Sequence, residues 1–262
     1  MATINAAETY GLLRYGAIAP GYRADMVLFD NLQDFNALMV FSNGIQFKTH
    51  PDTLLKRDPR IYNSVHLAPR KSGVLDLPVH DDMPVINLVP GELLTNLTFE
   101  TVPQKDGKFA PTSDLLKAAV FERHMSSGRV GLGILKGMKL HNGAIASTVG
   151  HDSHNLIVVG DNDEDMLKAV DVLETSSGGF AVVSQGTVLA HLPMPIAGLM
   201  SDLPLDEIIS RQEALLTAFR SIGEYADGDP FVTLSFIALP VIPHVRLTDM
   251  GLFHVTKMQF IQ

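Results

Sequence analysis

The apolar residues of this chain fall in short runs whose spacing changes along its length. Residues 2–13 carry apolar side chains at roughly helical spacing, which predicts a helix. The runs at 26–29 and 38–41 are typical of buried strands, and Asn43-Gly44 predicts a tight hairpin turn after the second. The first 48 residues therefore predict a helix followed by part of a β-structure.

Residues 49–110 are interrupted by prolines at short intervals, so long helices are not expected in this stretch. Short apolar segments near 62–67, 85–89 and 93–102 predict strands. We interpret the stretch as a connecting region with short strands.

From residue 111 onward the pattern becomes more regular. Helices are predicted over 162–175, where Asp161 or Asn162 can cap the first turn, and over 204–222. Strands are predicted at 117–123, 130–135, 144–149, 156–159, 180–184, 187–192, 231–239 and 252–260. Because strands outnumber helices and some form hairpins, the sequence predicts an α+β domain over 111–262, with a mostly antiparallel sheet and two helices.

The segment His151-Asp152-Ser153-His154-Asn155 gathers the richest chemistry of the chain, immediately before a predicted buried strand. Imidazole, carboxylate, hydroxyl and amide groups at the mouth of a strand can bind a metal ion or a polar heterocycle. The two histidines could bind one metal only if the segment turns, because they would lie on opposite faces of an extended strand. The alternative is a loop whose polar side chains satisfy its own backbone.

A second polar group, Glu122-Arg123-His124, follows another predicted strand. Glu122 and His124 could act as acid and base or contact a substrate, and Arg123 could hold an anion. The alternative is ordinary surface charge at the end of a strand.

Composition narrows the class of protein. A net charge of −9 argues against nucleic acid as the main partner. The absence of cysteine removes disulfides, thiolate ligands and a cysteine nucleophile. No apolar run approaches the length of a membrane span, and the first residues do not resemble a secretory signal, so we expect a cytoplasmic protein.

Several stretches together resemble adenine deaminase, a member of the amidohydrolase superfamily. Residues 16–30 resemble the segment where amidohydrolases leave their barrel and complete a small β-sandwich, and residues 1–7 resemble the last barrel helix. The stretches that resemble the adenine deaminase C-terminal domain are 143–147, 151–155, 158–160, 192–201 and 238–243. The resemblance implies three parts: 1–48 as the end of the barrel and a β-sandwich segment, 49–110 as the connection, and 111–262 as the C-terminal domain.

The resemblance also implies a reaction and its requirements. In the family, water activated by a divalent metal ion, manganese or iron, attacks adenine and releases ammonia. The metal is held by a His-x-His pair on the first barrel strand, and this chain contains no His-x-His sequence. We therefore expect the C-terminal part of an adenine deaminase that is inactive alone. The substrate of the parent enzyme is adenine, and we also expect the protein to form a homo-oligomer.

Within that enzyme, His151, Asp152 and His154 are the candidate catalytic residues, and Ser153, Asn155, Glu122 and His124 the candidate substrate-binding residues. No metal ligand is assigned in this chain. Two alternatives stay open: a stand-alone ligand-binding or oligomerisation domain without catalysis, and an independent hydrolase that holds its own metal at His151, Asp152 and His154.

Overall fold

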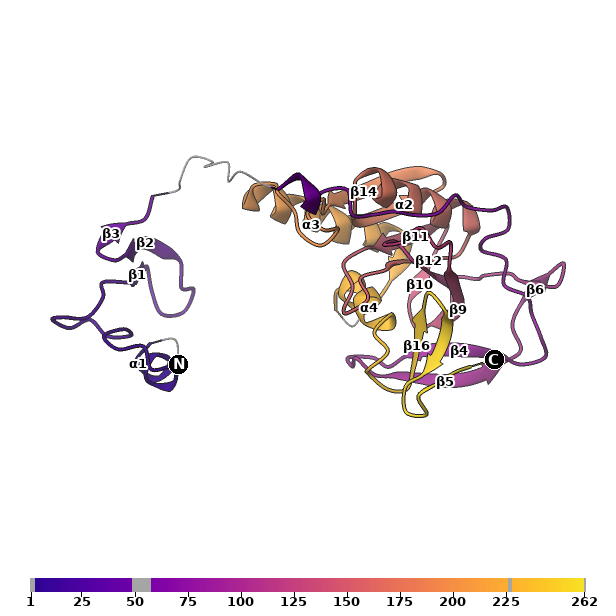
Figure 1. Cartoon of the computed structure of the whole chain (residues 1–262), viewed down its shortest axis with the longest axis horizontal. Coiled ribbons are helices and arrows are strands. Elements are labelled where there is room, and N and C mark those ends of the chain that lie inside the picture. Colours follow the sequence, from indigo (N-terminus) through magenta and orange to yellow (C-terminus); the bar gives the residue numbers. More distant parts are fainter. Residues whose placement is uncertain (1–2, 49–57, 226–227, 262) are drawn as a thin grey trace. The chain divides into compact units, whose positions relative to one another are not determined.

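The structure is a computed structural model that describes residues 3–48, 58–225 and 228–261 (Figure 1). The chain divides into two compact units, Met1–Arg57 and Asp58–Gln262, and each is treated separately below. No helix in the described ranges is long and apolar enough to cross a membrane.

The described part of the first unit contains one short helix and one small sheet. Helix α1 spans Ile4–Thr9, and the antiparallel strands are β1 (Met26–Phe29), β2 (Ala37–Ser42) and β3 (Ile45–Gln46). Asn43 and Gly44 both adopt positive φ, as the predicted two-residue turn between β2 and β3 requires. Among the described residues of this unit only Ala7 is buried, so the small sheet has no core beneath it.

The second unit is built on an eight-stranded sheet of order β14-β13-β11-β12-β8-β9-β4-β5. Its strands are β4 (Met83–Leu88), β5 (Thr95–Glu100), β8 (Leu115–Phe121), β9 (Val130–Lys136), β11 (Gly143–Ser147), β12 (Leu156–Gly160), β13 (Gly179–Ser184) and β14 (Thr187–Pro193). Neighbouring strands are antiparallel except for the parallel pair β4 and β9. The unit is therefore α+β with a mostly antiparallel sheet, as the sequence predicted.

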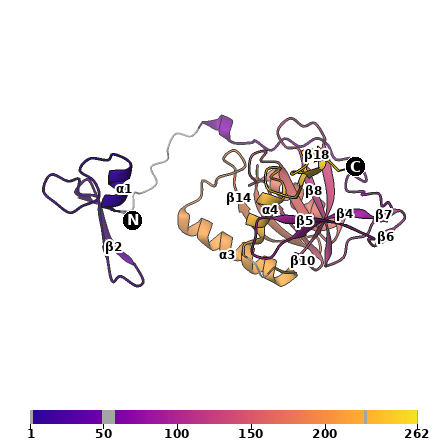
Figure 2. The same ribbon diagram turned by 90° about the horizontal axis from the view of Figure 1, so that it is seen from below.

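Helices cover both faces of this sheet. Helix α2 (Asp163–Thr175) packs its apolar stripe against the side chains of alternate strand residues, such as Ala144 and Val158. The intervening residues, such as Ile145 and Ile157, face α3 (Leu205–Ile222) and α4 (Pro230–Ile237), which can be followed in Figure 2. Because side chains alternate along a strand, the sheet is apolar on both faces and forms the middle layer of the unit.

Smaller elements complete the second unit. They are the 3₁₀ turn η1 (Pro59–Ile61), the pairs β6 (Gln104–Lys105) with β7 (Lys108–Phe109) and β10 (Lys139–Leu140) with β15 (Gly223–Glu224), and a three-stranded sheet of β16 (Val245–Thr248), β17 (Gly251–His254) and β18 (Gln259–Phe260). This last sheet lies against β9. A Cβ atom on Gly131 would come within 1.8 Å of the Thr248 carbonyl oxygen, so glycine in β9 allows this close approach.

The structure corrects some expectations. Residues 231–239 were predicted as a strand, but residues 231–237 lie in α4, so the described part of 111–262 contains three helices rather than two. Asp229 starts this helix by accepting hydrogen bonds from the Phe231 and Val232 backbone N–H groups, and Pro230 fits its first position. A uniformly apolar run has no period with which to separate helix from strand.

Two further differences concern strands. No strand forms at 62–67, and the segment 252–260 contains two strands, β17 and β18, joined by a turn. The predicted helices near 162–175 and 204–222 and the hairpin over 180–192 are confirmed.

Candidate functional site

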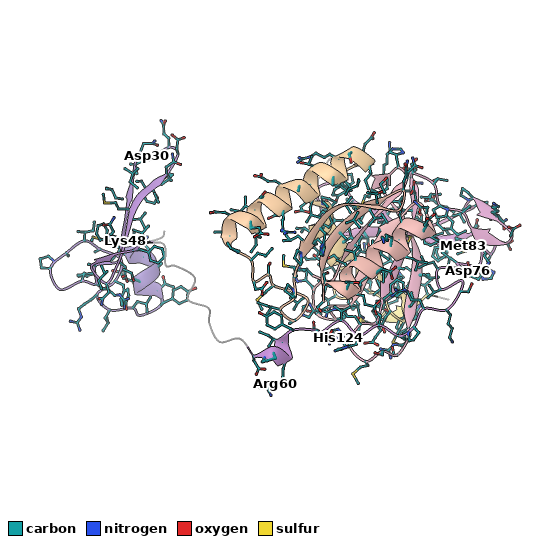
Figure 3. All side chains as sticks on the ribbon, turned by 90° about the horizontal axis from the view of Figure 1, so that it is seen from above. Asp30, Lys48, Arg60, Asp76, Met83 and His124 are labelled. Atoms are coloured by element: carbon teal, nitrogen blue, oxygen red, sulfur yellow. The ribbon has the colours of Figure 1, made fainter. Side chains whose placement is uncertain are left out.

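Both predicted polar segments lie at one end of two central strands. Strand β8 ends where β12 begins, since Phe121 pairs with Leu156 in the antiparallel register. Glu122 to His124, which follow β8, therefore lie beside His151 to Asn155, which precede β12. The register thus brings together the seven candidate residues, and the exposed His124 is labelled in Figure 3.

Arg123 is the buried centre of this cluster and is 1% exposed. Its guanidinium donates hydrogen bonds to the backbone carbonyls of His154, of Ser64 at 3.0 Å and of Ala197 at 3.1 Å. Burial lowers the pKa of Arg123 to about 10, so the group remains protonated at neutral pH. Arg123 therefore ties three chain segments together, and these donors are not directed to an anion.

Glu122 holds the turn that follows β8. Its Oε1 accepts hydrogen bonds from the backbone N–H groups of His124 (2.5 Å) and Met125 (2.8 Å). Its Oε2 accepts from the Ser127 N–H (3.0 Å) and hydroxyl (2.7 Å). Burial opposes the charged form, but these donors outweigh it and lower the pKa of Glu122 to about 2. The carboxylate is ionised at neutral pH and its oxygens are occupied by its own loop.

The pentapeptide forms a tight turn rather than an extended strand. Asp152 and His154 adopt positive φ, a conformation that few side chains favour. The His154 Nδ1 atom contacts the Gly150 carbonyl oxygen, while the His151 ring packs on the Phe236 ring with centroids 4.5 Å apart. The two imidazoles are thus engaged by different neighbours.

Contacts from outside the pentapeptide fix its position. The His124 Nε2 atom lies 2.8 Å from the Ser153 carbonyl oxygen, and the Asn155 amide donates to Asp249 at 3.2 Å. Across the described ranges, the Asp152 carboxylate and the Ser153 hydroxyl make no hydrogen bond, and both residues are exposed. These two groups are the ones that the turn leaves available to a ligand or a partner.

The arrangement does not fit a metal ion. In the ranges that the structure describes, no three His, Asp or Glu side chains are grouped to hold a cation. The His154 Nδ1 atom already contacts the Gly150 carbonyl oxygen, and the Glu122 carboxylate accepts hydrogen bonds from N–H and O–H donors. The divalent metal suggested by the resemblance has no suitable set of ligands among these residues.

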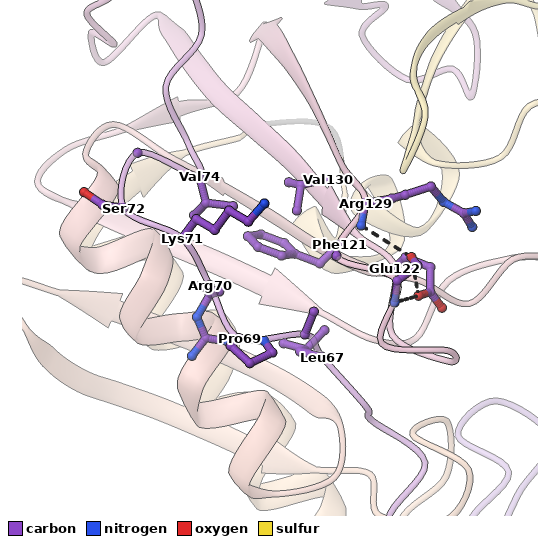
Figure 4. Close-up of a pocket in the computed structure, with 14 residues that line it drawn as sticks. Leu67, Pro69, Arg70, Lys71, Ser72, Val74, Phe121, Glu122, Arg129 and Val130 are labelled. Carbon is purple, nitrogen blue, oxygen red and sulfur yellow. Dashed lines mark hydrogen bonds between the residues drawn. The ribbon is translucent and has the colours of Figure 1, made fainter.

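A cavity of about 680 Å³ is partly lined by Glu122 (Figure 4). Its apolar surface includes Phe121 and Val130, and its rim carries Arg70, Lys71 and Arg129. Two of these cations are paired: Arg70 contacts Asp171 and Glu174, and Arg129 bonds Asp249 at 2.6 Å. Most of the positive charge at this rim is therefore neutralised by the protein itself.

Comparisons with known protein families establish the class of this chain. Residues 1–46 match the amidohydrolase family. Residues 92–259 match the adenine deaminase C-terminal domain, and this chain therefore belongs to that family. The resemblance proposed from the sequence is confirmed.

Curated relatives agree with this assignment over the entire chain. The chain is 43% identical to adenine deaminase 2 of Carboxydothermus hydrogenoformans and 42% identical to adenine deaminase of Lysinibacillus sphaericus, covering 100% of this chain and 47% of each relative. It is 43% identical to adenine deaminase of Nitratidesulfovibrio vulgaris, over 99% of this chain and 46% of that relative. The chain spans about half the length of the curated relatives it matches.

Proposed function

We propose that this chain is the C-terminal portion of an adenine deaminase, which hydrolyses adenine to hypoxanthine and ammonia in purine metabolism. The observation that carries the proposal is the match of the whole chain, at 42–43% identity, to proteins named adenine deaminase. In this proposal the protein is cytoplasmic and homo-oligomeric, and it does not act on nucleic acid or membranes. The parent enzyme uses manganese or iron, held by the part of the enzyme that precedes this chain.

In the same proposal, the first unit is the end of the catalytic domain. The amidohydrolase match over residues 1–46 supports an assignment of α1 to the last barrel helix and of β1 to β3 to a small β-sandwich. In this proposal residues 49–110 lead into the C-terminal domain at 111–262, and the described part of this stretch contributes β4 and β5 to the large sheet of that domain.

The pentapeptide contributes to the adenine site of the complete enzyme. Asp152 accepts an N–H group of the purine, and His151 and His154 complete a polar wall that excludes water from the reacting edge. Ser153 adds a hydroxyl group to this wall. His124 and Asn155 hold this turn in position through their hydrogen bonds, and Glu122 orders the neighbouring turn that carries His124, so these three residues reach adenine indirectly.

The test is a chimera in which this chain replaces the matching part of the Carboxydothermus hydrogenoformans enzyme. We expect the chimera to release ammonia from adenine, and the isolated chain, given manganese or iron, not to do so. A chimera that folds but is inactive contradicts the proposal and favours a stand-alone binding or oligomerisation domain. Turnover by the isolated chain that scales with its concentration contradicts the assignment of the metal site to the rest of the enzyme.

The role of the pentapeptide is tested in the same chimera. Asp152→Asn and His154→Ala are expected to lower kcat by at least about tenfold, equivalent to ~1.4 kcal/mol of transition-state stabilisation. The melting temperature should hardly change for Asp152→Asn, because that side chain is exposed and makes no hydrogen bond within the described chain. The matched control is Asp206→Asn on α3, which should retain full turnover. Full turnover in both test variants contradicts a catalytic role.

A further inference from the structure

Helix α4, which the sequence did not predict, places an aromatic ring against the pentapeptide. The centroid of the Phe236 ring lies 4.5 Å from that of the His151 ring, and the interplanar angle is 34°. Separations of this size are usual for aromatic pairs that attract each other. Phe236 is partly buried and His151 is exposed, so the packing covers one face of the imidazole and leaves part of that side chain open to solvent.

The three imidazoles near the turn are held in different ways. The Nδ1 atom of His154 contacts the Gly150 carbonyl oxygen, and the Nε2 atom of His124 lies 2.8 Å from the Ser153 carbonyl oxygen. Each of those rings therefore has one nitrogen engaged by the backbone. His151 makes no hydrogen bond within the described ranges, and its ring is engaged through its face instead. Of the three, only His151 keeps both ring nitrogens available.

Two available nitrogens are useful to a substrate only if the ring has a defined orientation. The outer torsion angle of a histidine side chain has a broad preference, so an exposed imidazole turns easily unless a neighbour packs against it. Contact with the ring face restricts this rotation and leaves the nitrogens, at the ring edge, accessible. A neutral imidazole held in this way can donate a hydrogen bond at one nitrogen and accept one at the other.

Helix α4 is a firm support for this contact. Phe231, Leu234 and Ile237 are buried in the core, and the helix contacts strands β11 and β12. Strand β12 begins at Leu156, directly after the pentapeptide, so the helix and the turn are attached to the same strand. Because a closely packed core resists displacement, α4 holds the Phe236 ring at a fixed position beside the turn.

We propose that Phe236 is a positioning residue for His151, and that His151 is the pentapeptide imidazole that contacts adenine. This inference rests on the proposed function, in which the pentapeptide contributes to the adenine site. Phe236 does not touch the substrate and acts through the orientation of the His151 ring. Loss of that orientation lowers turnover more than affinity, because the imidazole still reaches adenine but spends less time in the productive arrangement.

The first experiment tests the contact by NMR in the purified chain 1–262 with isotopically labelled histidine. The His151 ring signals are identified by their absence in His151→Gln. Because protons above an aromatic ring are shifted upfield, these signals should move downfield in Phe236→Leu and remain upfield in Phe236→Tyr. The matched control is Val232→Ala, at an exposed position of the same helix, which should leave the His151 signals unchanged.

The second experiment measures turnover in the chimera with the Carboxydothermus hydrogenoformans enzyme. Phe236→Leu is expected to lower kcat by about fivefold, which is the effect of losing an aromatic pair of ordinary strength, with little change in KM. Phe236→Tyr, which retains an aromatic ring, should restore most of the kcat, and the control Val232→Ala should retain it. In a His151→Ala background, Phe236→Leu should cause no further loss, because its partner ring is already absent.

The outcomes separate this proposal from the proposed function. Unchanged kcat in Phe236→Leu, an equal loss in Phe236→Tyr, or a further loss in the His151→Ala background overturns the positioning role and leaves the proposed function standing. His151 signals that do not move in Phe236→Leu overturn it as well. An inactive chimera contradicts the proposed function itself, and the positioning role with it. Far-UV circular dichroism checks folding, and Phe236→Met replaces Phe236→Leu if that variant is not folded.

Discussion

The two units use apolar residues in opposite ways. In the second unit β12 is buried along its whole length, and Ile157 and Val158 pack against helices on opposite faces of the sheet. In the first unit β1 has a similarly apolar sequence, yet Val27 and Leu28 are 47% and 50% exposed. The residues at 26–29 were predicted to form a buried strand, and the strand is confirmed while its burial is not. The difference shows that the same local pattern forms a strand with or without a core.

This contrast also separates what holds each unit together. The second unit buries side chains on both faces of its large sheet, so its stability is dominated by apolar burial. The described part of the first unit relies on backbone pairing and local polar contacts, such as those of Asp30 with Asn31 and Asn36. An isolated small sheet of this kind is marginally stable in water. The apolar side chains of the small sheet therefore remain largely exposed in the described part of the first unit.

The largest effect is expected from separating the units. Residues 58–262 should unfold cooperatively with nearly the melting temperature of the whole chain, because their core is complete. A peptide of residues 1–57 should show no cooperative transition. Circular dichroism melts of both pieces measure this. A cooperative melt of the short piece, or a large loss of stability in the long one, would contradict the proposed independence.

Truncating an apolar side chain should lower the free energy of unfolding by about 3 kcal/mol more in the second unit than in the first. Ile157→Ala removes a fully buried side chain and is expected to lower the free energy of unfolding by about 2–5 kcal/mol. Leu28→Ala removes an exposed side chain and should change it by less than about 0.5 kcal/mol. Urea unfolding of both variants gives the comparison. Equal losses would indicate that β1 is buried in the protein in solution.

The sequence predicted the parts of the fold whose signals are local. Helix α2 was predictable because Asn162 caps it, acidic residues fill its first turn and its apolar residues recur with helical period. Helix α4 was not, since its apolar residues show no period and its start depends on Asp229. Strand β16 was also missed, because the pattern at 245–248 is short and contains Arg246, whose guanidinium is buried against backbone carbonyls.

The sequence predicted the two segments of the candidate site separately, but not that they lie side by side. The sequence identified 122–124 and 151–155 as separate polar segments, but their meeting depends on the register of β8 with β12. The role of Arg123 depends on carbonyl groups from Ser64, His154 and Ala197, which are far apart in the sequence. Such contacts leave no spacing signal, and the distances among these segments are set by tertiary packing.

Acid should reveal the contribution of Glu122 to the second unit. Its folded pKa of about 2 lies below the ordinary value of 4.5, so its stabilisation is present above pH 4.5 and is lost as the pH falls toward 2. Glu122→Gln should lower the free energy of unfolding at pH 7 by about 2 kcal/mol and flatten its dependence between pH 5 and 2. Chemical unfolding across this pH range measures both effects. An unchanged pH dependence would show that the turn does not need the charge.

The smallest difference in stability between the units is expected when a local capping side chain is removed from each. Asp229→Ala removes the side chain that accepts from the first N–H groups of α4, which should cost about 1 kcal/mol. Asp30→Ala removes a comparable set of local hydrogen bonds in the first unit. Because the first unit is not part of the cooperative core, the main melting transition should fall for Asp229→Ala and stay unchanged for Asp30→Ala. A matching decrease in both variants would mean that the two units unfold together, and the independence inferred from burial would be lost.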